Sequence, residues 1–487
     1  MKQQWWKWFS LFLMFSLIQA CAGDSGGGGG GENGDEPVPE NAAEGASFTD
    51  TDIGTNEIAG DLTIIKAEDE SDLTHYVIYF GSDAETKADE TPLDTVVKTG
   101  SDITYSISNN TSTGGASHIL VFTKNENGEM ESGISLGITD YRVLGGTVQG
   151  RELSLSTVVT TVAGPDETTT SGDVDGSGST ARFDNPYGIT TDGSALFVVD
   201  RGNHKIREVT PSTWQVTTLF GDGSTSNAEI SEPAGITTDG SYLYFINYGW
   251  SGSNQGITKL NPDLTSDVAV IVNDASGDFN FPEDVVHHNG FLYVADTDND
   301  LIKKVDLSDN SIETFAGGGD GNGSTASDCG DDTTDCGSSS GNCYDGTGTD
   351  AKFNSPKGLT TDGTNLYVSD ANNCRIRKIV ISTGVVTTLA GDGDSSSSID
   401  GTGTNASIGT PVKITTDGIN LYVTDDWFRI VRKIVINTAE VTSLAGSGTY
   451  GSIDGTGSAA EFANPSGIVS DGERLYITNE NNLRQME

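Results

Sequence analysis

The feature that most constrains the fold is a pattern that occurs six times between residues 185 and 479: a proline, a leucine ten residues later, and Asp or Asn four residues after that. The six prolines are Pro186, Pro233, Pro282, Pro356, Pro411 and Pro465. Their spacings are 47 to 55 residues, with one of 74. A unit of this size cannot bury its apolar face alone and must stack on its neighbours. The sequence therefore predicts a repeat architecture of six units.

Each unit is predicted to contain four antiparallel strands. In the fourth unit, Asp362-Gly363 separates two apolar runs, and this dipeptide is typical of a hairpin because the turn needs positive φ. The next three strands are expected at 366–370, 374–379 and 386–391. The apolar fraction of 34% and the 63 glycines also favour short strands and turns over a helix-rich enzyme or a helical membrane protein. Four strands in such a unit form a blade of a β-propeller.

The blade number follows from how the ring closes. The sixth unit ends at Glu487, after its third strand, so its fourth strand is missing. Residues 159–164 read Val-Thr-Thr-Val-Ala-Gly, close to the fourth-strand sequence of 386–391. Pairing this segment with the last unit would close the ring and leave no long exposed edge. We therefore expect six blades, the last completed by a strand that precedes the first.

The repeats resemble NHL repeats, through Pro-x-Gly-Ile, Leu-Tyr-Val-x-Asp and Asn-x-x-Ile-Arg-Lys segments over about residues 157–487. We therefore expect an all-β chain, in which a small β-sandwich is followed by a six-bladed NHL-type propeller at 155–487 that is closed by its N-terminal strand. NHL propellers serve as scaffolds and as RNA- or protein-binding modules, and related six-bladed folds include enzymes. The fold alone therefore does not transfer a function.

The first 20 residues are predicted to be a bacterial lipoprotein signal peptide. Two lysines precede an apolar run too short for a permanent membrane span. The run ends in Ile18-Gln19-Ala20-Cys21, which resembles a lipobox and implies lipidation of Cys21. The alternative is an ordinary cleaved signal with Cys21 unmodified. Residues 21–46, with six consecutive glycines, are expected to form a flexible tether, and the chain to be an outer-membrane lipoprotein on its periplasmic or cell-surface side.

Residues 47–150 are expected to fold as a separate small β-domain. Period-two apolar runs such as 76–80 and 118–122 are separated by Gly, Asp and Asn, which is typical of a sandwich. The strand at 76–79 and the run from Val121 resemble the central strands of a fibronectin type III-like domain. No constellation here carries chemistry, so we expect a spacer or adhesive module.

The net charge of −45 excludes some partners. Nucleic acids and anionic lipids both reward Lys and Arg near phosphate. We therefore expect no nucleic-acid partner, membrane contact only through the N-terminal lipid, a protein or glycan ligand of unknown identity, and a monomer.

Six acidic or amide residues stand fourteen positions after the six prolines, at the same end of every second strand. We call these the cap residues: Asp200, Asn247, Asp296, Asp370, Asp425 and Asn479. As a ring they could line one mouth of the channel and bind a cation or sugar hydroxyls. Alternatively, each caps its own hairpin turn and pairs with a base such as Arg207 or Arg377. Metal ligands of related lactonases cannot be mapped onto these repeats, and no catalytic set is recognisable.

An Asp-Gly-x-Gly loop precedes four of the units, and its first copy partly matches a calcium-binding loop. It offers Asp173, Asp175, Ser177 and Asp184 at ligand spacing. However, its flanks are predicted strands and the bidentate Glu is missing. Calcium is thus a possible cofactor, and a structural turn is the alternative.

Aromatic residues in predicted turns are candidate platforms for sugars or proteins. They are Tyr248, Trp250, Trp427 and Phe428. Packing on a neighbouring loop is the alternative reading.

Four cysteines besides Cys21 are candidates for disulfides in an oxidising compartment. Cys329, Cys336 and Cys343 lie in an insertion at about 320–344, and Cys374 follows in the next blade. The sequence leaves their connectivity open.

Three functions remain open. The first is a lipid-anchored, non-enzymatic binding or scaffold protein of the cell envelope, favoured because the blades are regular and lack a catalytic set. The second is a metal-dependent hydrolase or lyase with its site in the channel. The third is a structural or adhesion component of the envelope.

Overall fold

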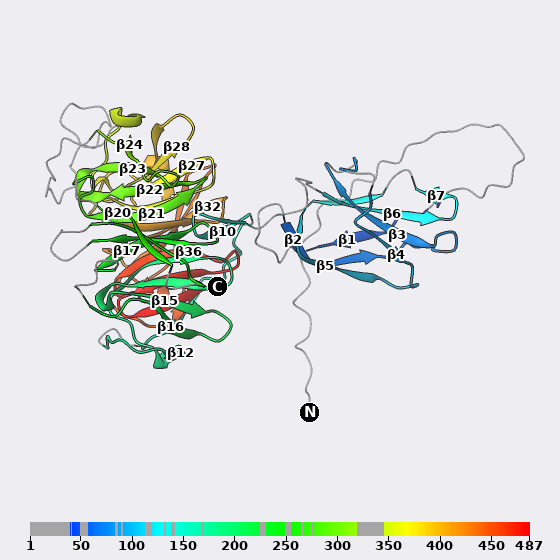
Figure 1. The fold of residues 1–487 in the computed structure, drawn as a ribbon, viewed down its shortest axis with the longest axis horizontal. Helices are drawn as coiled ribbons and strands as arrows, with labels where there is room; N and C mark the ends of the chain where they lie inside the picture. Colours follow the sequence, from blue (N-terminus) through cyan, green and yellow to red (C-terminus); the bar gives the residue numbers. More distant parts are fainter. Residues whose placement is uncertain are drawn as a thin grey trace, which may run out of the picture.

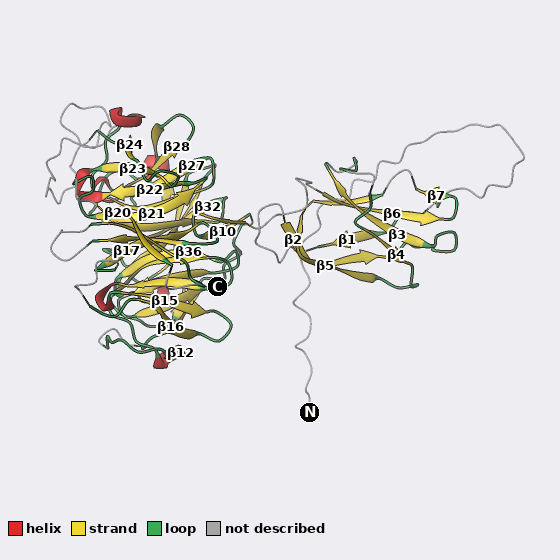
Figure 2. Ribbon diagram, in the orientation of Figure 1, coloured by secondary structure: helices red, strands yellow, loops and turns green. Residues whose placement is uncertain are grey.

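The computed structural model describes residues 39, 41–48, 57–82, 86–88, 91–112, 118–130, 133–137, 142–150, 152–166, 170–224, 230–248, 255–263, 267–273, 277–318 and 345–487 (Figure 1). Strands and connecting loops make up nearly all of them, with short 3-10 turns at the strand ends (Figure 2). Within these ranges, no helix has the length and apolar character needed to cross a membrane.

Six antiparallel sheets form the C-terminal part of the chain, and the innermost strand of each begins at one of the six prolines. Blade 1 contains β12 (Gly176–Ser177), β13 (Pro186–Thr191), β14 (Leu196–Asp200), β15 (Lys205–Thr210) and β16 (Gln215–Phe220). Blade 2 contains β17 (Pro233–Thr238), β18 (Leu243–Asn247), β19 (Gly256–Leu260) and β20 (Val268–Asn273). Blade 3 contains β21 (Pro282–His288), β22 (Phe291–Asp296), β23 (Leu301–Asp306) and β24 (Ile312–Ala316).

The remaining three blades follow the same order. Blade 4 contains β25 (Gly346–Thr347), β26 (Pro356–Thr361), β27 (Asn365–Asp370), β28 (Arg375–Val380) and β29 (Val385–Ala390). Blade 5 contains β30 (Gly401–Thr402), β31 (Pro411–Thr416), β32 (Asn420–Asp425), β33 (Ile430–Val435) and β34 (Glu440–Ala445). Blade 6 contains β35 (Gly455–Thr456), β36 (Pro465–Ser470), β37 (Leu475–Asn479), β38 (Asn482–Met486) and β11 (Val158–Ala163).

The ring closes as predicted. The six innermost strands contact one another in sequence, and β36 contacts β13 to complete the circle. The missing outer strand of blade 6 is β11, which pairs antiparallel with β38 through Val159–Met486, Thr160–Gln485 and Thr161–Arg484. The chain is an all-β protein with a six-bladed propeller, and the borrowed strand removes the open edge of its last sheet.

The repeated leucines and phenylalanines build the core between the blades. All six leucines ten residues after the prolines have zero exposure. Burying each one stabilises the fold by roughly 2 kcal/mol. Phe183, Phe353 and Phe462 lie in clusters that contain side chains from two neighbouring blades, so they fill the space between the blades.

Short 3-10 turns occupy two repeated places. After the Asp-Gly of the preceding loop come η1 (Gly178–Thr180), η5 (Gly348–Asp350), η7 (Gly403–Asn405) and η8 (Gly457–Ala459). Between the second and third strands of a blade lie η2 (Arg201–Asn203), η4 (Thr297–Asn299) and η6 (Ala371–Asn373).

The N-terminal part is a two-sheet sandwich. One sheet contains β1 (Gly45–Ser47), β2 (Glu57–Ile65) and β5 (Ile103–Ser112). The other contains β3 (His75–Gly81), β4 (Asp94–Val97), β6 (His118–Asn125), β7 (Gly128–Glu129) and β8 (Ile134–Gly137). Leu62 and Ile107 from the first sheet share a buried cluster with Tyr76 and Ile119 from the second.

Candidate binding site at the mouth of the propeller channel

A hairpin from the linker between the two domains closes one end of the propeller channel. It consists of β9 (Arg142–Leu144) and β10 (Thr147–Gln149), joined by Gly145 and Gly146, and we call it the plug hairpin. Figure 1 shows β10 on the side of the propeller that faces the sandwich. Sequence reasoning placed these residues in the sandwich domain, whereas they form a separate two-stranded sheet in contact with the inner strands of the propeller.

The plug hairpin is held by the ends of the inner strands. The backbone N–H of Thr191 donates to the Gly146 carbonyl at 3.0 Å, and Gln149 Nε2 donates to the carbonyl of Thr361 at 2.7 Å. Thr147 Oγ1 donates to the carbonyl of Ser470 at 3.2 Å. Gly146 has a φ of +77°, and a Cβ there would lie 1.9 Å from Thr190 Oγ1, so this close approach requires glycine. The plug hairpin does not contact the other end of the channel, where the inner strands begin; we call this end the mouth.

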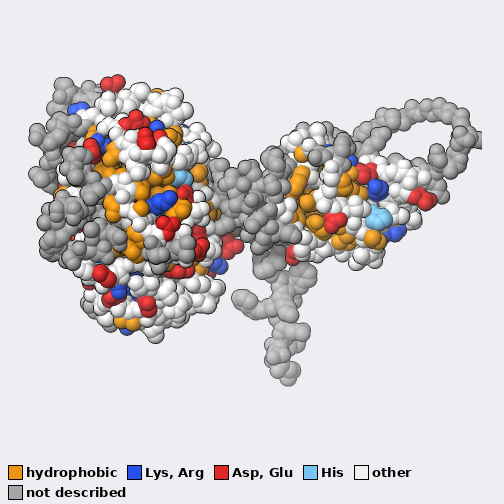
Figure 3. Space-filling model, in the orientation of Figure 1, with side chains coloured by type: hydrophobic (Ala, Val, Ile, Leu, Met, Phe, Trp, Pro, Cys, Tyr) orange, Lys and Arg blue, Asp and Glu red, His pale blue; other side chains and the backbone are white. Residues whose placement is uncertain are grey.

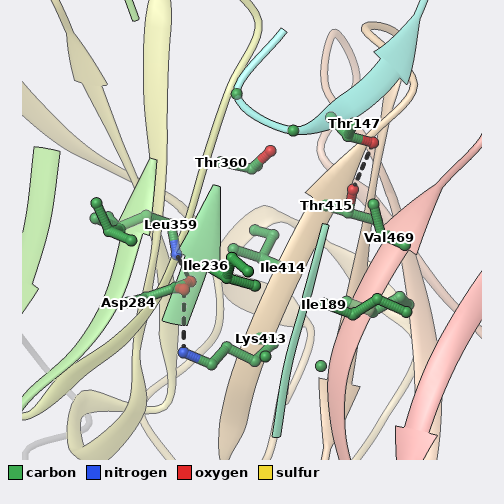
Figure 4. A pocket seen from close by; sticks show the side chains of 16 residues that line it. Thr147, Ile189, Ile236, Asp284, Leu359, Thr360, Lys413, Ile414, Thr415 and Val469 are labelled. Atoms are coloured by element: carbon green, nitrogen blue, oxygen red, sulfur yellow. Dashed lines mark hydrogen bonds and ion pairs between the residues drawn. The ribbon is translucent and has the colours of Figure 1, made fainter. Parts of the chain in front are cut away.

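Beneath the mouth the channel holds a cavity of about 30 Å³, lined by the tip of the plug hairpin and by inner strands (Figure 4). A space of this size has room for one or two water molecules. A lactone or sugar ring does not fit inside it, so a ligand of that size would have to lie across the mouth.

Two charged residues project into the channel where most repeats have glycine. Four units carry Gly two residues after the proline, but units 3 and 5 carry Asp284 and Lys413. Lys413 Nζ lies 3.2 Å from Asp284 Oδ1 and donates to the backbone carbonyls of Glu283 and Lys357 at 2.6 and 2.9 Å. The backbone N–H of Leu359 donates to Asp284 Oδ2 at 2.8 Å. Figure 4 shows this chain of contacts joining three inner strands.

Burial and charge act in opposite directions on this pair. Burial raises the pKa of Asp284 and lowers that of Lys413, while each partner's charge opposes the shift of the other. With both groups hydrogen-bonded to backbone as well as to each other, the buried pair has the contacts that an ionised pair requires. Sequence reasoning missed these two residues, although the break in the Pro-x-Gly pattern was a visible signal.

The mouth itself carries side chains that differ from blade to blade. Two positions lie at this end of each unit: the residue after the proline and the residue after the cap residue. The first set is Tyr187, Ala234, Glu283, Lys357, Val412 and Ser466. The second set is Arg201, Tyr248, Thr297, Ala371, Asp426 and Glu480. Basic, acidic and apolar side chains also alternate on the propeller surface seen in Figure 3.

An arginine and two tyrosines contact one another at the mouth. The guanidinium carbon of Arg201 lies 5.1 Å from the ring centre of Tyr187 and 4.7 Å from that of Tyr248. Tyr187 donates its hydroxyl hydrogen to Glu283 Oε2 at 2.5 Å. Tyr248 is 3% exposed, and its hydroxyl has no hydrogen-bond partner among the described residues. Burial raises the pKa of both tyrosines well above the usual value, and the charge of Glu283 adds to the rise.

The predicted cap residues do not meet at the mouth; each lies buried within its own blade. Their exposures are between 0 and 2%. Asp370 is typical: it accepts hydrogen bonds from the Asn354 backbone N–H at 2.8 Å and from Asn373 Nδ2 at 2.9 Å, and forms an ion pair with Arg377 at 2.8 Å. Equivalent backbone contacts to the preceding loop exist at Asp200, Asn247, Asp296 and Asn479. These contacts are those of the alternative in which each residue caps its own turn.

Asp425 is the exception among the cap residues. It accepts a hydrogen bond from the Phe428 backbone N–H at 2.9 Å, and its Oδ2 is buried without a partner. Phe428 stands where blade 4 has Asn373, which donates a hydrogen bond to Asp370. Arg432, the equivalent of Arg377, forms its ion pair with Asp400 at 3.1 Å. Burial consequently raises the pKa of Asp425 to about 7.

The candidate calcium loop is occupied by the protein's own cations. Asp173 lies 2.6 Å from Lys205 Nζ, and Asp175 lies 2.8 Å from Arg207 NH2. Ser177 donates to the carbonyl of Thr213, and Asp184 donates its backbone N–H to Asp200. Among the described ranges, no group of three or more His, Cys, Asp or Glu is arranged to hold a metal ion. The same Asp–Arg pairing recurs in the other Asp-Gly-x-Gly loops, at Asp345–Arg377, Asp400–Arg432 and Asp454–Arg484.

The other candidate residues have varied positions. Trp427 is 68% exposed on the turn after β32, whereas Tyr248 is buried and packs edge-on against Phe281 at 5.7 Å. Cys374 is fully buried at the start of β28, where its φ is +52°. The remaining candidates lie outside the described residues: Cys21, Trp250, Cys329, Cys336 and Cys343.

Sequence comparison relates this chain to proteins with NHL repeats. No family model matches the chain. It is 25% identical over 280 residues to NHL repeat-containing protein 2 of Bos taurus, an alignment that covers 42% of this chain and 38% of that protein. It is 26% identical over 327 residues to the chloroplastic protein SUPPRESSOR OF QUENCHING 1 of Arabidopsis thaliana, covering 63% and 25%. The chain is similar in sequence to NHL-repeat proteins. It spans about two fifths or less of the length of these relatives.

Solved structures support the NHL-type propeller fold over a longer stretch. A Bacteroides thetaiotaomicron protein of unknown function matches with a TM-score of 0.54 at 19% identity, covering 93% of this chain and 98% of that one. An auxiliary nutrient binding protein from the same species matches with a TM-score of 0.52 at 14% identity and the same coverage. A third, an auxiliary nutrient binding protein of Bacteroides ovatus, has a TM-score of 0.51 at 16% identity. At these identities the likeness concerns the fold alone.

Proposed function

We propose that this chain is a lipid-anchored, non-enzymatic binding protein of the bacterial cell envelope, and that its propeller holds a protein or glycan at the mouth of the channel. The observation that carries the proposal is the plugged channel. The plug hairpin closes one end, and the cavity beneath the mouth has room only for water. A larger ligand would therefore bind at the mouth, where the side chains differ from one repeat to the next.

The structural neighbours support this proposal for the whole chain. Two of them are auxiliary nutrient binding proteins whose folds cover at least 92% of this chain. In this proposal, lipidated Cys21 anchors the chain in the outer membrane, the sandwich acts as a fibronectin type III-like spacer, and Cys374 forms a disulfide with a cysteine of the 320–344 insertion. Because Figure 1 places the plug hairpin between sandwich and propeller, the mouth faces away from the spacer.

The anchor and the binding function need separate tests. Alkyne-palmitate labelling and membrane fractionation of cells that express the full chain should place it in the membrane fraction. Cys21→Ala should abolish both labelling and retention, whereas labelling that survives in this variant would refute the anchor. For binding, capture of envelope extract by the purified chain should be lost with Trp427→Ala and retained with Lys304→Ala, a substitution on the side of blade 3. Equal capture by both variants would place the binding face elsewhere.

A further inference from the structure

We propose that the mouth is a saccharide-binding site in which Arg201, Glu283 and Lys357 hydrogen-bond the hydroxyl groups of an uncharged sugar. This inference rests on the proposed binding function and names its ligand class. It is carried by basic and acidic side chains at the mouth: Arg201 and Glu283 both contact Tyr187, and Arg201 and Lys357 form no ion pair among the described residues.

Basic residues are scarce in this chain, which has 71 acidic and only 26 basic residues. The buried arginines of blades 1, 4, 5 and 6 all pair with carboxylates. In contrast, among the described residues, Arg201 and Lys357 form no ion pair within 4.0 Å. Acidic groups nevertheless lie near Lys357. Burial raises the pKa of Asp298 and of Asp426, and the positive charge of Lys357 opposes both shifts.

Opposite charges separated in this way suit a ligand that both donates and accepts hydrogen bonds. A sugar hydroxyl donates its hydrogen to a carboxylate such as Glu283 and accepts from a guanidinium or ammonium group. An anionic ligand would instead face Glu283, Asp298 and Asp426, and a cationic ligand would face Arg201 and Lys357. An uncharged polyol satisfies both signs at once.

Aromatic contacts hold the donor edge of Arg201 in place. Its guanidinium lies over the rings of Tyr187 and Tyr248, which fixes the plane of the fork before any ligand arrives. The hydroxyl of Tyr248, buried beside Arg201 without a partner, is a second polar group that a ligand at this site could satisfy. Trp427, 68% exposed, and Phe281, 44% exposed, add apolar faces at the same end of the propeller.

The cavity beneath the site limits how the sugar lies. Because this space is only about 30 Å³ and is crossed by the Asp284–Lys413 pair, the ring of a sugar cannot descend into the channel. It therefore spans the mouth, where blades 1, 3 and 4 supply Arg201, Glu283 and Lys357.

The test uses the chain from Cys21 to its C-terminus on an array of neutral and uronic-acid-containing oligosaccharides, followed by calorimetric titration of the strongest-binding oligosaccharide. We expect a neutral oligosaccharide whose affinity is nearly the same in 50 and 500 mM NaCl, because no net charge is neutralised on binding. Arg201→Ala, Glu283→Gln and Lys357→Ala should each weaken binding at least tenfold. The matched control is Arg474→Ala, which removes the same charge at the plugged end of the propeller.

Lys357→Ala keeps the test decisive if the other variants fold poorly, because its ammonium makes no hydrogen bond within the described structure. Unchanged affinity in this variant would overturn the proposed site, although a binding function elsewhere on the chain would survive. Binding only to uronic-acid sugars, with affinity that falls steeply in salt, would overturn the uncharged ligand. Capture of a protein at the mouth with no sugar bound would overturn the saccharide class and leave the proposed binding function standing.

Discussion

Replacing Asp425 by asparagine should stabilise the protein at pH 8, although the same change at an equivalent residue should destabilise it. In the folded chain Asp425 has a pKa of about 7, against an ordinary value of 3.8, because it is buried with one oxygen unsatisfied. A carboxamide cannot ionise and can still accept the hydrogen bond from the Phe428 N–H. It therefore resembles the protonated acid that the site prefers.

The sign and size follow from proton linkage. Because the folded pKa is raised, the native state holds a proton that the unfolded chain releases as pH rises above about 4. Stability is therefore lost progressively between about pH 4 and pH 7, by roughly 1.4 kcal/mol per pH unit. The folded and unfolded pKa values differ by about three pH units, so ionisation of Asp425 costs at most about 4 kcal/mol of folding stability. We expect Asp425→Asn to raise the free energy of unfolding by about 2 to 4 kcal/mol at pH 8.

Urea unfolding followed by circular dichroism at pH 4.5, 6 and 8 measures the effect. The stability difference between Asp425→Asn and the parent should be small at pH 4.5 and grow towards pH 8. The matched control is Asp370→Asn, because Asp370 pairs with the buried Arg377 at 2.8 Å and should lose roughly 3 to 5 kcal/mol at pH 8. A destabilised Asp425→Asn protein, or a difference that does not vary with pH, would mean that Asp425 is ionised and paired, and would refute the reasoning.

Three further predictions concern the channel and the first loop. Lys413→Met should destabilise the propeller by about 3 to 5 kcal/mol in urea unfolding, because it leaves Asp284 buried and unpaired, whereas glycine at both positions, as in the other blades, should restore most of that loss. Gly146→Val should expel the plug hairpin, since its Cβ would clash with Thr190, and faster hydrogen exchange across 142–150 would report this; unchanged exchange would contradict it. Chelator dialysis should leave the melting temperature unchanged, because Lys205 and Arg207 already neutralise Asp173 and Asp175; a drop of several degrees would indicate a bound ion there.

The propeller could be predicted from the sequence because its signals are local and repeated. A turn such as Asp362-Gly363 dictates its own hairpin, and the unpaired segment 159–164 has only one vacant edge to fill. Because each sequence pattern recurs in several units, a chance match in one unit does not mislead the prediction.

The candidate site could not be predicted in the same way, because it depends on contacts between distant segments. The strands of the plug hairpin are only three residues long, and its partners, such as Ser470 and Thr361, lie more than 200 positions away. Asp284 and Lys413 are 129 positions apart in sequence and meet only because the ring brings blades 3 and 5 to a common axis. Burial of the cap residues likewise depends on the loop that folds over each of them.

The internal repeat nonetheless separates structural from functional positions once the register is known. A residue that is the same in all six blades solves a problem that every blade has, such as closing the turn after the second strand, and the cap residues do this. Recognition of one asymmetric ligand by a six-fold ring requires the opposite, namely residues that differ between blades. At the mouth, the residues after the prolines and after the cap residues vary in charge, from Arg201 and Lys357 to Glu283 and Asp426. Variation among the repeats therefore marks the binding face more reliably than their shared acids do.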